Sequence, residues 1–477
     1  MMRYVVRMCL TLAVLVAWLG GCAAPADRGG PESPAAVAAE GPARPNIVLI
    51  VADDLGWADL SSTGSRYYET PNIDRLGREG MYFPQFYVSQ NCSPTRACMM
   101  TGQYAPRTGV YTVTNLDRGR EENRKMNVPE NVTNLPLDRM TVADVLKAAG
   151  YATGMFGKWH LGQGEDYHPG NRGFDEAIVS MGRHYDFSTN PRVGVSKGAY
   201  LADFLTDRAV QFIEKNKGRP FFLYLPHFAV HTPLEAKPEP IEKFEGKPPA
   251  GGHNNPTYAA MIASLDESVG RVLAKLDELK LSDRTMVIFT SDNGGVGGYE
   301  AAGISAGEIT DNAPLRAGKG TLYDGGIRVP YFVKYPPMVQ AGTTCDTPAI
   351  HVDILPTLVE LAGADRPNQP LDGVSIVPLF KDSKTALSRE ALFWHFPGYL
   401  EGKGGNWRTT PVGVIRCGDF KLMEFYEDGR LELYNLKDDL GEKTNLAARM
   451  PEKARELRGR LAAWRMELRA VMPTPKK

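Results

Sequence analysis

Cys92 lies in a run of residues that could hold a nucleophile beside a bound anion. The run reads Asn-Cys-Ser-Pro-Thr-Arg-Ala-Cys-Met-Met-Thr-Gly over residues 91–102. Ser93 is a good helix N-cap, Pro94 suits the first helical position, and Gly102 ends a helix of about two turns. Cys92 is therefore expected at the positive end of this helix, where free backbone N–H groups favour an anion. Arg96 adds a permanent charge whose planar fork fits a tetrahedral oxyanion.

The alternative interpretation of Cys92 is a buried structural thiol or half of a disulfide. For an isolated cysteine this alternative would be favoured. The neighbouring Pro94 and Arg96, and the Thr-Gly pair that closes the run, favour a reactive residue instead.

Hard oxygen donors directly follow two predicted strands. The strands cover residues 47–51 and 285–290, and both are buried, β-branched runs. In open α/β sheets the ligand site lies beyond the carboxyl ends of the strands. Each donor pair alone is more typical of a turn, but three carboxylates and an amide together with the Cys92 run predict a site for Ca²⁺ or Mg²⁺. The four residues are Asp53, Asp54, Asp292 and Asn293.

Two lysines and a histidine lie in segments that could face the same site. Lys158 and His160 belong to the sequence Gly-Lys-Trp-His-Leu-Gly, which follows a predicted strand at 151–156. Alternation in an extended segment puts both side chains on one side, although a plain surface strand is the alternative. Lys319 lies in a glycine-rich stretch over residues 316–330, where glycines permit close backbone approach to a ligand. An exposed loop lysine is the alternative there.

These segments resemble the signature motifs of the type I, formylglycine-dependent sulfatases of the alkaline phosphatase-like superfamily, including bacterial arylsulfatases and polysaccharide sulfatases. The resemblance runs from about residue 45 to residue 447. It implies that a formylglycine-generating enzyme oxidises Cys92. It also implies that residue 92 and the four strand-end donors bind a cation, with Ca²⁺ favoured and Mg²⁺ as the alternative. Arg96, Lys158 and Lys319 would neutralise the sulfate oxygens.

The same resemblance assigns the proton transfers to two histidines. His231, in the segment Val-His-Thr-Pro, is the candidate for protonating the leaving alcohol, with Lys319 as a helper. His160 is the candidate for accepting a proton from hydrated formylglycine, and the two roles could be exchanged. The implied activity is sulfate monoester hydrolysis. A phosphatase or phosphodiesterase of the same superfamily, and a catalytically silent glycan-binding protein, are the alternatives.

A sulfated glycan is the expected substrate, with a sulfated small molecule as the other possibility. The segment Phe-Trp-His-Phe-Pro at 393–397 resembles one found in polysaccharide-acting sulfatases, where the C-terminal domain reaches the active site. Trp394 could stack on a sugar and His395 could hydrogen-bond it. A core aromatic pair is the alternative.

The composition is that of a globular protein, with 477 residues, 43% hydrophobic and 23% charged. The formal net charge of -1 gives no global field toward nucleic acid or an anionic membrane, so attraction for an anion must be local. The strand and helix pattern predicts an α/β fold, with a large, mostly parallel mixed sheet flanked by helices, in a catalytic domain over residues 46–384. Antiparallel strands expected at 413–416, 420–426 and 431–436, and a helix over 452–472, predict a smaller α+β subdomain over 385–477.

The first 22 residues resemble a lipoprotein-type signal peptide. Arg3 and Arg7 precede an apolar run too short to span a bilayer, and Leu-Gly-Gly-Cys ends at Cys22. A membrane anchor helix is the alternative. Residues 23–45, rich in Ala, Pro and Gly, predict a flexible tether. The protein is therefore expected to be exported, in the periplasm or at the cell surface, and held at a membrane by a lipid on Cys22.

If Cys22 is lipidated and Cys92 is oxidised, Cys98, Cys345 and Cys417 remain after removal of the signal peptide. At most one disulfide can form among these three.

Overall fold

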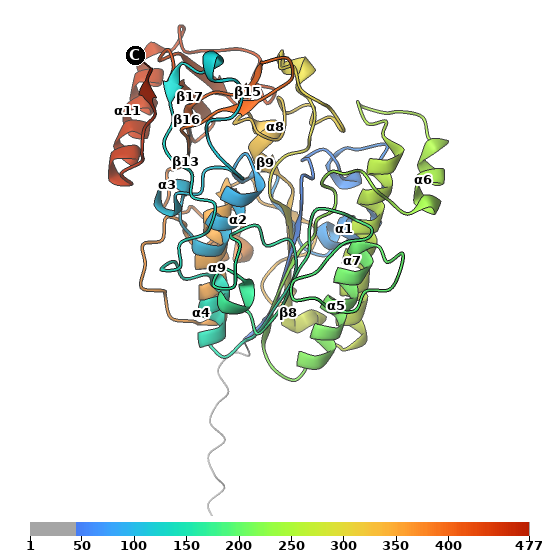
Figure 1. The fold of residues 1–477 in the computed structure, drawn as a ribbon. Helices are drawn as coiled ribbons and strands as arrows, with labels where there is room; N and C mark the ends of the chain where they lie inside the picture. Colours follow the sequence, from blue (N-terminus) through green and yellow to red (C-terminus); the bar gives the residue numbers. More distant parts are fainter. Residues whose placement is uncertain (1–43, 477) are drawn as a thin grey trace, which may run out of the picture. The chain divides into compact units, whose positions relative to one another are not determined.

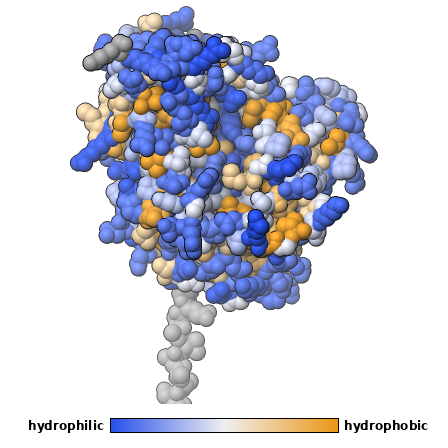
Figure 2. Space-filling model, viewed as in Figure 1, coloured by the Kyte–Doolittle hydropathy of each residue, from blue (hydrophilic) through white to orange (hydrophobic). Residues whose placement is uncertain are grey.

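The computed structural model describes residues 44–476, which belong to one compact unit that begins at Arg44. The expected signal peptide and nearly all of the expected tether lie outside the described residues. Within the described range, no helix is long and apolar enough to cross a membrane. The face drawn in Figure 2 is mostly hydrophilic, with hydrophobic residues in small separate groups.

An eight-stranded sheet forms the centre of this unit, with the strand order β11-β2-β10-β8-β1-β7-β5-β6. β1 (Asn46–Ala52) pairs in parallel with β7 (Phe221–Pro226) on one side and β8 (Thr285–Ser291) on the other. β5 (Ala152–Gly157) is parallel to β7, whereas β10 (Tyr331–Lys334) is antiparallel to β8. Every residue of β1, β7 and β8 is buried, as expected for central parallel strands. The predicted mostly parallel α/β sheet is confirmed.

Helices cover both faces of this sheet (Figure 1). α1 (Pro71–Arg78), α5 (Leu201–Asn216) and α7 (Pro256–Glu278) share one hydrophobic core with alternate residues of β1. α4 (Val142–Ala148) and α9 (Ile354–Ala362) share the opposite core with the other residues of β1. One strand serves both cores because successive side chains of a strand point to opposite faces.

A second sheet, antiparallel throughout, lies in the C-terminal part of the chain. β16 (Val412–Cys417), β17 (Phe420–Phe425) and β18 (Leu431–Asn435) correspond to predicted strands, whereas β13 (Ala391–Phe396) was not predicted. α11 (Pro451–Glu467) packs on this sheet and ends earlier than predicted, because Arg469 adopts a left-handed backbone conformation. The predicted C-terminal sheet and helix are therefore present.

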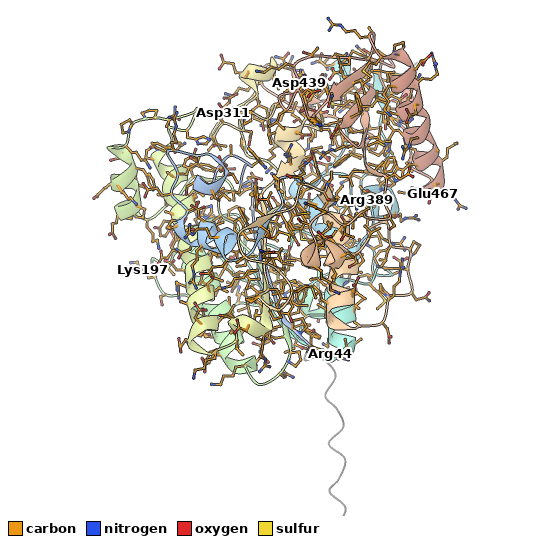
Figure 3. The ribbon with its side chains drawn as sticks, turned by 180° about the vertical axis from the view of Figure 1, so that it is seen from behind. Arg44, Lys197, Asp311, Arg389, Asp439 and Glu467 are labelled. Carbon is orange, nitrogen blue, oxygen red and sulfur yellow. The ribbon has the colours of Figure 1, made fainter. Side chains whose placement is uncertain are left out.

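A buried ion network joins the C-terminal sheet to the catalytic part of the chain. Lys421 Nζ, on β17, lies 2.8 Å from Asp324 and 2.8 Å from Glu442, and all three side chains are fully buried. Glu442 also accepts the backbone N–H of Asp324 at 2.7 Å. Asp311 and Asp439, labelled in Figure 3, line a cavity of about 700 Å³ at the same junction.

Shorter elements connect the two sheets and shape the loops. β3 lies between β9 and β12 in a small three-stranded sheet, and β14 pairs with β15. The four cysteines in the described part of the chain are unpaired. The shorter elements are β2 (Met81–Tyr82), β3 (Phe86–Tyr87), α3 (Ala105–Thr108), β4 (Met126–Asn127), β6 (Glu176–Val179), α6 (Pro238–Glu245), α8 (Asp324–Ile327), β9 (Arg328–Val329), β11 (Thr343–Thr344), β12 (Ala349–Ile350), α10 (Val377–Lys381), β14 (Leu400–Glu401), β15 (Trp407–Thr409) and β19 (Thr474–Pro475).

Candidate active site

Cys92 is the first residue of α2 (Cys92–Thr101), and every residue of this helix is buried. The first helical backbone bond ends at the carbonyl of Asn91, which has extended dihedral angles. Asn91 is therefore the N-cap residue, and the expectation that Ser93 caps the helix is wrong, because the first turn begins before it. Gly102 ends the helix as predicted, with a left-handed φ of 68°. Cys92 thus stands at the positive end of α2.

The structure brings the four strand-end donors together around Cys92. The last residues of β1 and β8 are register partners, so the residues that follow these strands leave the sheet side by side. The backbone N–H of Asp54 donates to Asp292 at 3.2 Å, and the amide of Asn293 donates to Asp54 at 2.8 Å. The thiol of Cys92 lies 3.4 Å from Asp53. All five side chains are buried.

Each of the three carboxylates faces one basic side chain. The guanidinium of Arg96 donates through two of its nitrogens to a single carboxylate oxygen. Five of the six charged groups are almost entirely buried, and the side chain of Lys319 is 13% exposed. Three negative and three positive charges therefore balance around the thiol. The pairs are Arg96 with Asp292 at 2.7 Å, Lys158 with Asp53 at 2.6 Å, and Lys319 with Asp54 at 2.7 Å.

Burial opposes charge throughout this cluster. It acts against the ionisation of Asp53, but Lys158 and the other nearby cations hold the pKa of that carboxyl well below its usual value. For Asp292, burial and the charge of Asp53 raise the pKa to about 6 in spite of Arg96. Burial and the charge of Asp292 also raise the pKa of the Cys92 thiol far above its usual value. An unmodified Cys92 is therefore a neutral thiol, and the helix N-terminus does not overcome its desolvation.

The two predicted histidines reach the cluster from different loops. His231 Nε2 lies 3.7 Å from Asp54, and Nδ1 donates to the carbonyl of Thr232 at 2.6 Å. His160 has a φ of 59°, and its buried Nδ1 has no hydrogen-bond partner among the described residues. Burial and the charge of Lys158 lower the pKa of His160 to about 2, so its ring is neutral at neutral pH. A neutral imidazole can accept a proton.

Two supporting residues, Asn312 and His184, were not predicted from the sequence. The buried amide of Asn312 donates to three backbone carbonyls of the loops that carry Asn293 and Lys319. His184 Nε2 donates to the backbone carbonyl of His231 at 2.8 Å. Neither residue lies in one of the predicted motifs: His184 is 47 residues from His231, and Asn312 bonds carbonyls that are 5 to 17 residues away.

Trp394 and His395 are buried, each with 5% of its surface exposed. Trp394 donates its ring N–H to the carbonyl of Val88 at 2.8 Å. The two ring nitrogens of His395 lie 2.8 Å from the hydroxyl of Tyr426 and 2.9 Å from the carbonyl of Val471. Both rings are enclosed and hydrogen-bonded inside the protein. This arrangement favours the alternative interpretation, a core aromatic pair, over contact with a sugar.

Comparison with known proteins agrees with this geometry. A sulfatase family model matches residues 45–364, and a model of the C-terminal part of N-sulphoglucosamine sulphohydrolase matches residues 318–467. A sulfatase of Formosa agariphila is 36% identical over 88% of each chain. The N-acetylgalactosamine-6-sulfatase of Canis lupus familiaris is 35% identical over 72% of this chain and 67% of its own length. The crystal structure of Ps i-CgsB in complex with k-i-k-neocarrahexaose has a TM-score of 0.74 and 31% identity, covering 88% of this chain and 92% of that one.

The fold and the buried charge cluster define a hydrolase of the alkaline phosphatase-like superfamily. Within that superfamily the chain belongs to the sulfatase family, and it is an enzyme that hydrolyses sulfate esters. Membership implies formylglycine and a divalent cation at the site. The same matches favour a sulfatase over the two alternatives, a phosphatase or phosphodiesterase and a catalytically silent glycan-binding protein.

The variant His395→Ala is expected to lower the free energy of unfolding by about 1–3 kcal/mol, because it removes a buried ring and leaves the hydroxyl of Tyr426 and the carbonyl of Val471 without this hydrogen-bond partner. Chemical denaturation measures this loss. Hydrolysis of 4-nitrophenyl sulfate and of a sulfated oligosaccharide should change by the same factor. A loss confined to the oligosaccharide would show instead that His395 contacts the sugar.

Proposed function

We propose that this sulfatase removes sulfate from a glycan, through formylglycine at position 92. The observation that carries the proposal is that Cys92 lies among three buried carboxylates, each paired with a base, of which Arg96 and Lys158 are buried and Lys319 is partly exposed. The glycan assignment is supported by two of the similar proteins. One is named for N-acetylgalactosamine 6-sulfate, and the other was solved with a neocarrahexaose.

The residues around Cys92 fit a divalent cation. Ligand atoms of Asp53, Asp54, Cys92 and His231 all lie within 4.8 Å of one another. One oxygen each of Asp53 and Asn293 is buried and accepts no hydrogen bond from a described residue, although Lys158 forms an ion pair with the former. When bound, the cation supplies positive charge for the sulfate group and the nucleophile. We assign it as Ca²⁺, which suits a site with this many protein oxygens better than Mg²⁺ does. Its ligands are Asp53, Asp54, Asp292, Asn293 and residue 92.

Oxidation to formylglycine explains how position 92 can act as a nucleophile. The thiol itself is held neutral by burial and by Asp292. Hydrated formylglycine supplies two hydroxyl groups. One attacks sulfur with release of the alcohol, and loss of the proton of the other expels sulfate as the aldehyde reforms. An enzyme of the formylglycine-generating type is therefore a required partner during maturation.

The surrounding side chains bind the sulfate and move the protons. Arg96, Lys158 and Lys319 place three fixed positive charges around position 92, where they neutralise sulfate oxygens. His231 is partly exposed, so its ring can reach the departing alcohol and protonate it. His160 is neutral and accepts the proton of the second hydroxyl.

A cavity of about 730 Å³ beside His160 offers room for the sugar. Its volume falls in the usual range for ligand sites. No Asp, Glu, Lys or Arg side chain lines it, and the amides offer hydrogen bonds to sugar hydroxyl groups. The lining includes Asn115, Asn134, Gln163, His168 and Asn190.

Purified enzyme is expected to hydrolyse 4-nitrophenyl sulfate with a kcat/KM at least about a hundredfold above that for 4-nitrophenyl phosphate. The three bases already face three carboxylates, so the extra negative charge of a phosphate monoester has no further compensation. Parallel steady-state assays of nitrophenol release measure the ratio. A ratio near or below one would favour a phosphatase and contradict the proposal.

We also propose that the protein is exported and carries a lipid on Cys22. The support is the signal-like sequence over residues 1–22, which lies outside the described range. Metabolic labelling with a fatty acid, compared between the wild type and Cys22→Ala, tests this anchor.

A further inference from the structure

Two arginines outside the catalytic cluster, Arg118 and Arg408, are held close together. Arg118 lies in the loop between α3 and β4, and Arg408 lies in β15. A Cβ atom on Gly119 would lie 2.5 Å from the ring of Trp407, so the loop and the strand are in direct contact. Gly119 also has a φ of 76°, where glycine is favoured. Burial and the charge of Arg408 lower the pKa of Arg118, as expected for neighbouring guanidinium groups.

Arg408 packs on the segment that carries Lys319. Its guanidinium lies 5.0 Å from the centre of the Tyr299 ring, and the hydroxyl of Tyr299 donates to the carbonyl of Lys319 at 2.6 Å. A Cβ atom on Gly320 would lie 3.3 Å from Cδ of Arg408. Arg408 therefore contacts Gly320, which directly follows Lys319 of the sulfate site.

Arg118 contacts a residue that lines the cavity beside His160. Its Nη2 donates to the hydroxyl of Thr114 at 2.8 Å, and Thr114 lines that cavity. The pair therefore contacts the segment that carries Lys319 through Arg408, and it contacts Thr114 of this cavity through Arg118.

The positive charge of this pair has no ion-pair partner among the described residues, although the carboxyl carbon of Glu401 would lie 3.7 Å from a Cβ atom on Gly119. Neither guanidinium forms an ion pair with a carboxylate in the described range 44–476, and Nε of Arg408 is buried without a hydrogen-bond partner there. Arg124, on the same loop as Arg118, does face a carboxylate, that of Asp117. Holding two partly buried like charges together costs free energy unless an anion binds between them.

We propose that Arg118 and Arg408 form a second anion subsite, which binds a negative group on the sugar next to the sulfate that is cleaved. A second sulfate ester and a carboxylate both fit, since a guanidinium fork binds either in two-point contact. The inference rests on the proposed function and specifies its substrate further: a glycan with at least two anionic groups close together.

Inhibition of 4-nitrophenyl sulfate hydrolysis by matched sugars tests this subsite. One pair is glucosamine 6-sulfate and glucosamine 2-N,6-O-disulfate. The other is N-acetylgalactosamine 6-sulfate alone and joined to a uronic acid. In at least one pair the second anion should lower the inhibition constant about tenfold or more, which corresponds to about 1.4 kcal/mol. The pair that responds shows whether the second group is sulfate or carboxylate.

The variants Arg118→Gln and Arg408→Gln, singly and combined, should lose this advantage. Arg408→Lys should retain part of it, because the charge remains while the fork is lost. Arg120→Gln, at an exposed position on the same loop, should keep the wild-type preference. The inference is overturned if no pair shows an advantage, or if the advantage survives in the double variant. Failure of the wild type to hydrolyse 4-nitrophenyl sulfate at all would instead overturn the proposed function.

Discussion

Cys92→Ser is expected to lower kcat for 4-nitrophenyl sulfate by at least about a thousandfold, or about 4 kcal/mol of barrier. A serine hydroxyl can attack sulfur once, but it has no second hydroxyl whose deprotonation would expel the sulfate. The variant should therefore stop after one event, and intact-protein mass spectrometry should show one added sulfate group. In the wild type, the peptide that spans position 92 should carry an aldehyde or its hydrate.

Cys98→Ser is the matched control for this variant. Cys98 lies in the same helix, is equally buried and is also an unpaired thiol, so the substitution changes the same atom without touching the charge cluster. It should retain turnover. Full activity in wild-type protein whose Cys92 is entirely unmodified, or sustained turnover by Cys92→Ser, would refute the formylglycine mechanism.

Asp292→Asn is expected to lower kcat/KM by at least about a hundredfold and to weaken calcium binding in parallel. The amide still offers an oxygen to Arg96, so the fold keeps that contact. The charge balance changes, however, because three bases then face only two carboxylates, and the excess positive charge repels a cation. Elemental analysis gives the bound metal. Calcium should also raise the melting temperature of the wild type more than that of the variant.

Asp59→Asn serves as the control for a buried carboxylate outside the cluster. Asp59 is fully buried and hydrogen-bonded to Tyr258 and Thr310, and no basic residue of the sulfate site contacts it. This variant can lose stability but should still bind calcium. Full activity of wild-type enzyme shown to be free of metal would contradict the cation site.

The site residues that directly follow the ends of strands could be predicted from the sequence. Asp53 and Asp292 follow two apolar runs, and the pairing of β1 with β8 places them side by side at one edge of the sheet. The rule that ligands bind at the carboxyl ends of strands requires no knowledge of side-chain contacts. The apolar runs at 47–51, 151–156 and 285–290 also predicted β1, β5 and β8 to within one residue of their observed bounds.

Contacts between distant loops could not be predicted in this way. Asn312 and His184 support the site by hydrogen bonds to backbone carbonyls, and no spacing rule marks either residue. The environment of His395 depends on Tyr426 and Val471, which belong to other elements. An aromatic segment that is suited to bind sugar has the same sequence pattern as one that is packed in a core. Only the three-dimensional arrangement separates the two.

The buried link from Lys421 to Asp324 and Glu442 has a consequence for engineering this enzyme. Exchanging the C-terminal sheet for that of another sulfatase would be an attractive way to change the sugar specificity. A graft that lacked the lysine would leave Asp324 ionised and enclosed without its main partner, at a cost of about 3–5 kcal/mol. A workable chimera must therefore carry the lysine and both acids over as one unit, and its crossover point must lie before Asp324 rather than at the start of the C-terminal sheet.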